Sequence, residues 1–119
     1  VEADLQDAPE WIAAPMRAAL ADARASARWM LDHAGDDPNT LGAASYAYMQ
    51  LIGVLAVGWM WVRMVGAVDG RGDDFAAAKR ITARHYAERS LPLTSTLRAR
   101  VQAGAENLMA LPEEAFVRS

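Results

Sequence analysis

Cysteine is absent from this chain of 119 residues, and its absence excludes several kinds of chemistry. Without a thiol there can be no disulfide, no thiolate metal ligand and no cysteine nucleophile. Such usage is typical of cytosolic proteins, and we expect a cytoplasmic location. The chain begins with Val1 and has no basic segment followed by an apolar one. We therefore expect no signal peptide and interpret the sequence as a piece of a longer protein.

Basic residues are also scarce, because 12 of them face 15 acidic ones and leave a net charge of −3. They are scattered among the acids rather than clustered, as on solvated helix faces. A nucleic-acid surface needs a basic patch, so we expect no nucleic-acid partner.

Alternating runs of valine, isoleucine and threonine are missing too, whereas alanine is abundant. This composition favours helix throughout. A chain of this length forms one core, and no linker, internal repeat or low-complexity tract divides it. The sequence therefore predicts a single all-α domain over residues 1–119.

The first helix is expected to begin near residues 8–9 and to end near His33. Asp7 is the expected N-cap, and Gly35 can take the left-handed conformation that closes a helix. Pro15 removes one backbone hydrogen bond inside it. The apolar residues recur at spacings of three and four, which gives one inward stripe of Met16, Leu20, Ala23, Ala27 and Met30.

The second helix is expected over residues 41–68, with Asn39 or Thr40 as its cap. Twelve residues without a charged or amide side chain, LIGVLAVGWMWV, separate Gln50 from Arg63. A helix that is apolar on nearly all sides is either covered by protein or lies in lipid. We expect this long apolar helix to be the centre of a bundle, sandwiched between two neighbours.

A membrane span is the alternative for this segment, because about 20 apolar residues suffice to cross a bilayer. Ser45, Tyr46, Tyr48, Gln50 and three glycines dilute its hydrophobicity, and no basic cluster flanks it. A membrane partner is therefore not expected. A third possibility is an exposed flank that forms an oligomer interface, since a three-helix bundle hides only part of such a helix.

The third helix is expected to open at Asp73 or Asp74, which can cap it. Because its apolar residues keep the same phase beyond Pro92, the sequence predicts one helix kinked at that residue rather than two helices. The expected inward stripe is Phe75, Ala78, Thr82, Tyr86, Leu93, Leu97, Val101 and Ala105. With an apolar tail at residues 108–112 that packs back, the prediction is an up-down-up three-helix bundle.

No group of residues predicts catalysis or metal binding. His33 and His85 have no second histidine one turn away, so neither forms a metal motif. The loop at residues 69–73 has acids at both ends, which disfavour an anion site. Glu113 and Glu114 are adjacent and point in different directions, and no serine stands in a nucleophile elbow. We expect no catalytic, cofactor-binding or metal site in this chain.

Three segments carry a resemblance to a known family: GWMWVRM at residues 58–64, AKRITARHYAER at 78–89 and AGAENLMALP at 103–112. In this order and spacing they resemble the extra C-terminal domain of a branch of bacterial acyl-CoA dehydrogenases, which includes the 3-methylmercaptopropionyl-CoA dehydrogenases. The resemblance covers about residues 10–116. His85 and Ser90 depart from the family pattern, in which an aromatic residue and leucine are common at these positions.

The resemblance implies a non-catalytic helical domain that follows the flavin-binding and catalytic domains of a longer enzyme. In such enzymes a glutamate removes the α-proton of an acyl-CoA and FAD takes the β-hydride. Neither the motif of that glutamate nor the flavin pocket is found here, so no cofactor is expected in this fragment and FAD is expected in the parent. The implied partners are the remainder of the dehydrogenase, its acyl-CoA substrate and further copies in a homo-oligomer.

The positions that match the family are interpreted as packing contacts. Trp59, Trp61, Arg63, Arg84 and Tyr86 are the candidates for contacts with another domain or subunit. Trp59 and Trp61 lie about 200° apart around a helix, so they cannot both face one neighbour. The alternative function is a membrane-associating or partner-binding helical module.

Overall fold

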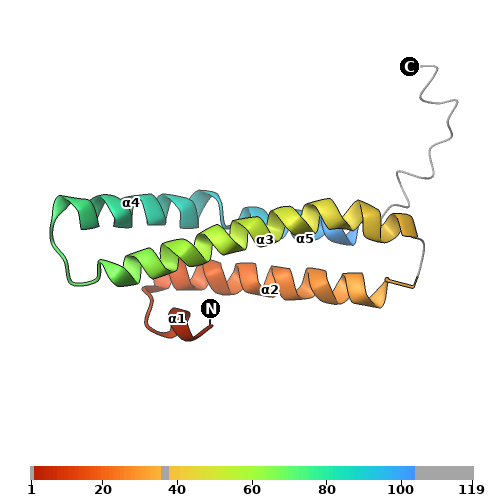
Figure 1. The fold of residues 1–119 in the computed structure, drawn as a ribbon, viewed down its shortest axis with the longest axis horizontal. Helices are drawn as coiled ribbons and strands as arrows, with labels where there is room; N and C mark the ends of the chain where they lie inside the picture. The colour runs from red at the N-terminus through yellow and green to blue at the C-terminus, as the bar shows by residue number, and fades with distance from the viewer. Residues whose placement is uncertain (1, 36–37, 104–119) are drawn as a thin grey trace, which may run out of the picture.

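The computed structural model describes residues 2–35 and 38–103, which form helices joined by short turns (Figure 1). The helices are α1 (Glu2–Gln6), α2 (Glu10–Asp32), α3 (Pro38–Ala67), α4 (Asp74–Arg89) and α5 (Leu93–Gln102). No strand occurs in these two ranges, so the predicted all-α class is confirmed. Ala105, the tail at 108–112, Glu113 and Glu114 lie outside the described residues.

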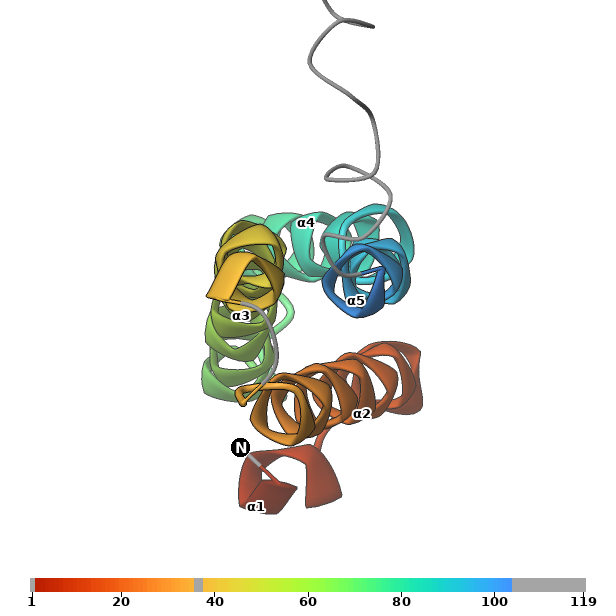
Figure 2. The ribbon, with the colours of Figure 1, turned by 90° about the vertical axis from the view of Figure 1, so that its right-hand side faces the viewer.

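The other helices are arranged along α3, the longest element (Figure 1). α2 runs antiparallel to α3, while α4 lies beside the C-terminal half of α3 and α5 beside its N-terminal half. In Figure 2, which looks along the bundle, α2, α3 and the α4–α5 pair form a triangle, because α2 contacts α4 and α5 as well as α3. The prediction that α3 is sandwiched between two neighbours is therefore wrong.

Among the described residues, α3 is covered on one side only. Its buried residues recur at spacings of three, four and seven, which places them on one side of the helix. They are Ala44, Ala47, Leu51, Gly58, Val62 and Val65. An apolar window of 18 residues within α3 is only 22% buried. Much of the apolar surface of α3 thus lies outside the core.

The predicted third helix is two helices in the structure. Residues 90–92 form a turn between α4 and α5, and the two helices follow each other in much the same direction (Figure 1). The amides of Ser90 and Leu91 both donate to the carbonyl of Tyr86, at 2.8 and 3.1 Å, and Pro92 precedes the first residue of α5. Because proline has no amide to continue α4, the chain starts a new helix instead of bending the old one.

The helix ends differ from the prediction in several details. α1 was not expected. Its Leu5 side chain is 2% exposed and anchors the helix in the core. Asp7 does not cap α2, which starts after Pro9 without a side-chain hydrogen bond. Gly35 does not take the left-handed conformation, since Gly70 is the one described residue with a positive φ, at 77°. Asp73 is at the N-cap position of α4, as predicted, but its side chain makes no capping hydrogen bond.

Small residues dominate the contacts of α4. Ala76, Ala83 and Ala87 are buried, whereas Phe75 and Thr82 are exposed, so the predicted inward stripe of this helix is wrong for those two positions and for Ala78. Alanine lets the backbones of neighbouring helices approach closely. The close packing of the alanine face of α4 outweighs what burial of the Phe75 ring would contribute. The stripe predicted for α2 holds better, with two of its members buried and the other three partly buried.

Candidate interaction surface

The described part of the chain contains no group of three or more histidine, aspartate or glutamate residues that could hold a metal ion. His33 stacks on the indole of Trp29, with ring centroids 4.1 Å apart, and its Nδ1 lies 2.7 Å from the Trp29 carbonyl oxygen. His85 is exposed on α4. Neither histidine therefore belongs to a metal-binding group among the described residues.

Trp59, a predicted contact residue, makes its polar contact within the chain. Its Nε1 donates to Oδ2 of Asp4 in α1 at 2.7 Å, and the guanidinium of Arg63 lies 5.3 Å from its ring centroid. Asp4 was not foreseen, because nothing in a five-residue helix signals a partner 55 residues away. The Trp59–Asp4 hydrogen bond thus joins α1 to α3, while the contact of Arg63 with Trp59 lies within α3.

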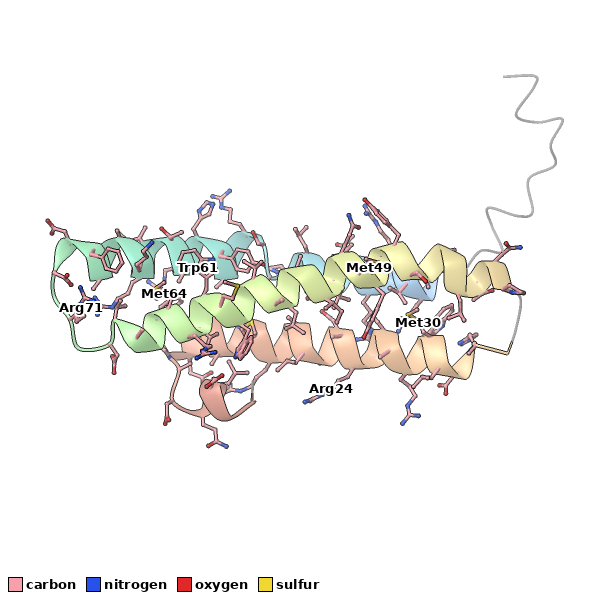
Figure 3. The ribbon with its side chains drawn as sticks, viewed as in Figure 1. Arg24, Met30, Met49, Trp61, Met64 and Arg71 are labelled. Carbon is pink, nitrogen blue, oxygen red and sulfur yellow. The ribbon has the colours of Figure 1, made fainter. Side chains whose placement is uncertain are left out.

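Trp61 lies on another side of α3 from Trp59, between α3 and α4, and is partly buried against the core (Figure 3). Tyr86 of α4 is also partly buried, and its hydroxyl donates to the Val54 carbonyl at 2.6 Å. Burial raises the pKa of the Tyr86 phenol, because the charged form would lose hydration. Trp59 and Trp61 face different helices, as their spacing around α3 predicts.

Arg84, the fifth predicted residue, crosses from α4 to α2. Its guanidinium lies 5.0 Å from the ring centroid of Trp11. Sequence reasoning did not single out Trp11, although a tryptophan in the first turn of a helix is a plausible cation partner.

Phe75 makes a similar contact at the start of α4. Arg71 and Lys79 lie over its ring, at 5.4 and 5.1 Å from the centroid. Arg71 also donates to Oδ2 of Asp73 at 2.6 Å, and this hydrogen bond holds the pKa of the Asp73 carboxyl below its usual value. Arg71 marks this end of the molecule in Figure 3, and Met30 lies near the other end.

The feature most suited to a partner is the uncovered side of α3. We call it the outer strip and define it by five residues, Tyr46, Met49, Gly53, Val57 and Met60. Tyr46, Met49 and Met60 are 72%, 71% and 65% exposed, and Val57 is 42% exposed. Gly53 is exposed as well, and a Cβ built on it would meet no atom within 4 Å. Single exposed apolar residues are ordinary, but a contiguous row along a helix marks an interaction site.

The sequence showed that α3 has more apolar surface than one core face needs, but it did not show which side of the helix would be exposed. α3 is apolar all round, so periodicity alone could not show which side the core would take. α3 has the exposed flank that sequence analysis kept as a third possibility, and its use as an oligomer interface stays a prediction. The outer strip does not include the five residues predicted as contacts, four of which make polar or cation–ring contacts inside the chain.

α3 is also the one described helix that is long and apolar enough to cross a membrane. This property follows from length and composition, and the core helix of a soluble protein meets it too. The incomplete burial of α3 keeps the membrane interpretation open as an alternative use of the same surface.

Comparison with known proteins identifies the chain at the level of a family. A family model described as "Acetyl-CoA dehydrogenase C-terminal like" matches residues 1–112. No curated protein matches the chain.

Proposed function

Because the chain belongs to the acetyl-CoA dehydrogenase C-terminal-like family, we propose that it is the non-catalytic C-terminal domain of an FAD-dependent acyl-CoA dehydrogenase. The observation that carries this proposal is the match over residues 1–112, nearly the whole chain. Within the family, the three segments at 58–64, 78–89 and 103–112 favour the 3-methylmercaptopropionyl-CoA dehydrogenase branch.

The domain contributes packing between domains or subunits of the parent enzyme. Its outer strip is apolar and uncovered by the rest of the described chain, as expected for a surface that is buried in a larger assembly. FAD and the acyl-CoA thioester bind elsewhere in the parent, which removes an α-proton and a β-hydride from the acyl chain. The parent is a cytoplasmic homo-oligomer in this proposal.

The reading frame upstream of Val1 provides the first test. An in-frame dehydrogenase of several hundred residues agrees with the proposal, and a start codon next to Val1 contradicts it. The second test compares the purified parent with a version that lacks this domain. We expect the shortened enzyme to lose thermal stability or subunit association, while any flavin that remains bound still oxidises the substrate.

The isolated chain of 119 residues gives the complementary result. It should fold as a helical protein, show no flavin absorbance after purification and oxidise no acyl-CoA. Flavin that copurifies at one equivalent, or dehydrogenase activity of the isolated chain, would overturn the non-catalytic role.

A membrane-associating module is the second candidate, and the length and low burial of α3 favour it. Flotation of the chain with liposomes of neutral and anionic lipids distinguishes the two. Stable flotation would support the membrane role, and a chain that stays soluble and ignores both kinds of liposome would exclude it.

A further inference from the structure

The outer strip has a symmetric sequence about its middle residue, Gly53. Four residues before and after Gly53 stand Met49 and Val57, and seven residues before and after stand Tyr46 and Met60. Steps of four and seven residues return to nearly the same side of a helix. Read from either end, the strip therefore presents a large residue, a second apolar residue and then glycine.

We propose that the outer strip binds the outer strip of a second copy of this chain, with the two α3 helices antiparallel and the two Gly53 residues at the two-fold axis. This inference rests on the proposed packing role and names the partner. A two-fold interface uses the same patch on both copies: if residue i of one copy contacts residue j of the other, then j of the first contacts i of the second. The patch must therefore fit against a copy of itself that runs in the opposite direction. The outer strip meets that condition, because Tyr46 faces Met60 of the second copy and Met49 faces Val57.

Glycine at the axis permits a close approach of the two helices. Nothing lies within 4 Å of a Cβ built on Gly53, so its backbone is open to a neighbour. Small residues at a crossing point let helix backbones come together while larger side chains fill the space on either side. α3 also stands at one edge of the bundle in Figure 2, with α2 and the α4–α5 pair away from that edge.

Charge favours the antiparallel arrangement over the parallel one. Between Gln50 and Arg63 there is no charged residue on α3, so the strip itself brings no like charges together. In a parallel pair the two Arg63 side chains would lie side by side and repel each other. Around an axis at Gly53 they are twenty residues apart, on the order of 30 Å at the rise of a helix.

The area is enough for a dimer of moderate strength. The exposed fractions of the strip indicate an apolar patch of roughly 400–600 Å² on each copy, the size of the largest patch on a typical monomer, which is often functional. Pairing would bury on the order of 1,000 Å² in total, at the lower limit of specific interfaces. We therefore expect a dimer that dissociates at low concentration rather than an obligate one.

Because the chain has no cysteine, introduced thiols can report on the arrangement without background. Y46C and M60C are prepared separately in the full chain, mixed and oxidised under mild conditions. The proposal expects the mixed disulfide between residues 46 and 60 to dominate. Two residues 46 would lie on the order of 21 Å apart, too far for a disulfide, which needs Cα atoms within about 7 Å. Dominant 46–46 and 60–60 disulfides would overturn the antiparallel pairing.

Sedimentation equilibrium of the full chain supplies a test that does not depend on thiols. Met49→Lys should weaken the dimer at least tenfold while the helical circular dichroism stays unchanged. Ile81→Lys on α4 is the matched control, since Ile81 is also 71% exposed but lies outside the strip, and it should leave the dissociation constant within about twofold. Equal effects of the two variants would overturn the proposal.

A wild-type chain that is monomeric at all accessible concentrations would also overturn the pairing. That result leaves the proposed function testable on its own, because the parent that lacks this domain would still show reduced stability if the strip packs on the dehydrogenase body. Flotation of the monomer with liposomes would instead assign the strip to lipid.

Discussion

Arg80 joins α4 to the end of α3 through one guanidinium nitrogen. Its Nη2 donates to the carbonyls of Val68 and Arg71, each at 2.7 Å. Both carbonyls belong to the loop between α3 and α4, and the Val68 carbonyl also accepts from the Arg71 amide, so the arginine ties α4 to this loop. We expect Arg80→Met, which keeps the apolar stem, to lower the free energy of unfolding by about 1–3 kcal/mol.

Urea unfolding at constant protein concentration measures this effect. Arg28→Met is the control, because Arg28 is exposed on α2 and its change should stay within about 0.5 kcal/mol. Equal losses for both variants would show that the Arg80 hydrogen bonds do not contribute to stability.

Tyr86 couples stability to alkaline pH. Its pKa in the folded chain is raised by burial, so folding favours the neutral phenol. The corresponding stability is fully present below the pKa of an unfolded tyrosine, about 10, and is lost as pH rises through the folded value. Tyr86→Phe should cost about 1 kcal/mol at neutral pH through the lost bond to the Val54 carbonyl, and it should flatten the fall in stability above pH 10.

Unfolding by urea at pH 7 and at several values above 10 checks both parts of this prediction. Wild type, measured at the same pH values, is the comparison. A slope that falls equally in wild type and Tyr86→Phe would contradict the assignment.

At the scale of the element, Gly58 is the glycine of α3 whose described neighbours leave no room for a Cβ. A Cβ at this position would lie 2.7 Å from Sδ of Met16 and 2.8 Å from Cδ2 of Leu91. The site lies inside the core, so a larger side chain cannot turn to solvent. Gly58→Leu should lower the free energy of unfolding by about 1–3 kcal/mol despite the higher helix propensity of leucine.

Gly66 provides the matched position on the same helix, because it is exposed and nothing lies within 4 Å of its built Cβ. Gly66→Leu should leave stability unchanged or raise it by up to about 1 kcal/mol. Thermal unfolding of Gly58→Leu and Gly66→Leu compares the two positions. Similar midpoint temperatures would show that packing does not restrict the size of residue 58. Gly53 of the same helix is open among the described residues, as Gly66 is, and would accept a side chain that Gly58 would not.

The helices themselves were largely predictable, and the failures have local causes. α3 was expected over 41–68 and extends over Pro38–Ala67, because a proline is accepted in the first turn. α1 escaped notice, since five residues show no helical period. The apolar residues keep the same helical spacing before and after Pro92, and this suggested one helix. Such spacing shows which side of a helix faces inward, but not whether the backbone hydrogen bonds continue through the proline.

At the scale of the whole molecule, the sequence indicated that α3 would have surplus apolar surface, but not which of its residues would form it. A helix that is apolar all round signals surplus apolar area, and sequence analysis expected two neighbours to cover it. The core took its phase from small residues such as Ala44, Ala47 and Gly58, which admit close neighbours on one side. The two tryptophans of α3 were predicted to contact another domain or subunit. The indole N–H of Trp59 instead donates to Asp4 of the same chain, a contact that no local sequence pattern indicates.

Stability should also be uneven along the bundle. The largest cluster of buried residues joins α1 and α2 to the C-terminal half of α3 and to α4, whereas two smaller clusters lie near α5. Local opening follows the number of buried apolar contacts, so the α5 end should open at a lower free energy than the α4 end. Native-state hydrogen exchange, at a concentration where the rates no longer depend on protein amount, measures this difference.

Amides at 44–50 of α3 should therefore exchange through partial opening, while those at 58–65 should require global unfolding. The Asp22 carboxylate, which accepts from Thr94 and Arg98 of α5, opposes this opening. Asp22→Ala should accelerate exchange at 44–50 more than at 58–65, because it frees α5 without touching the larger cluster. Equal acceleration along the whole of α3 would show that the bundle opens as a single unit and that the smaller clusters are as firmly held as the largest one.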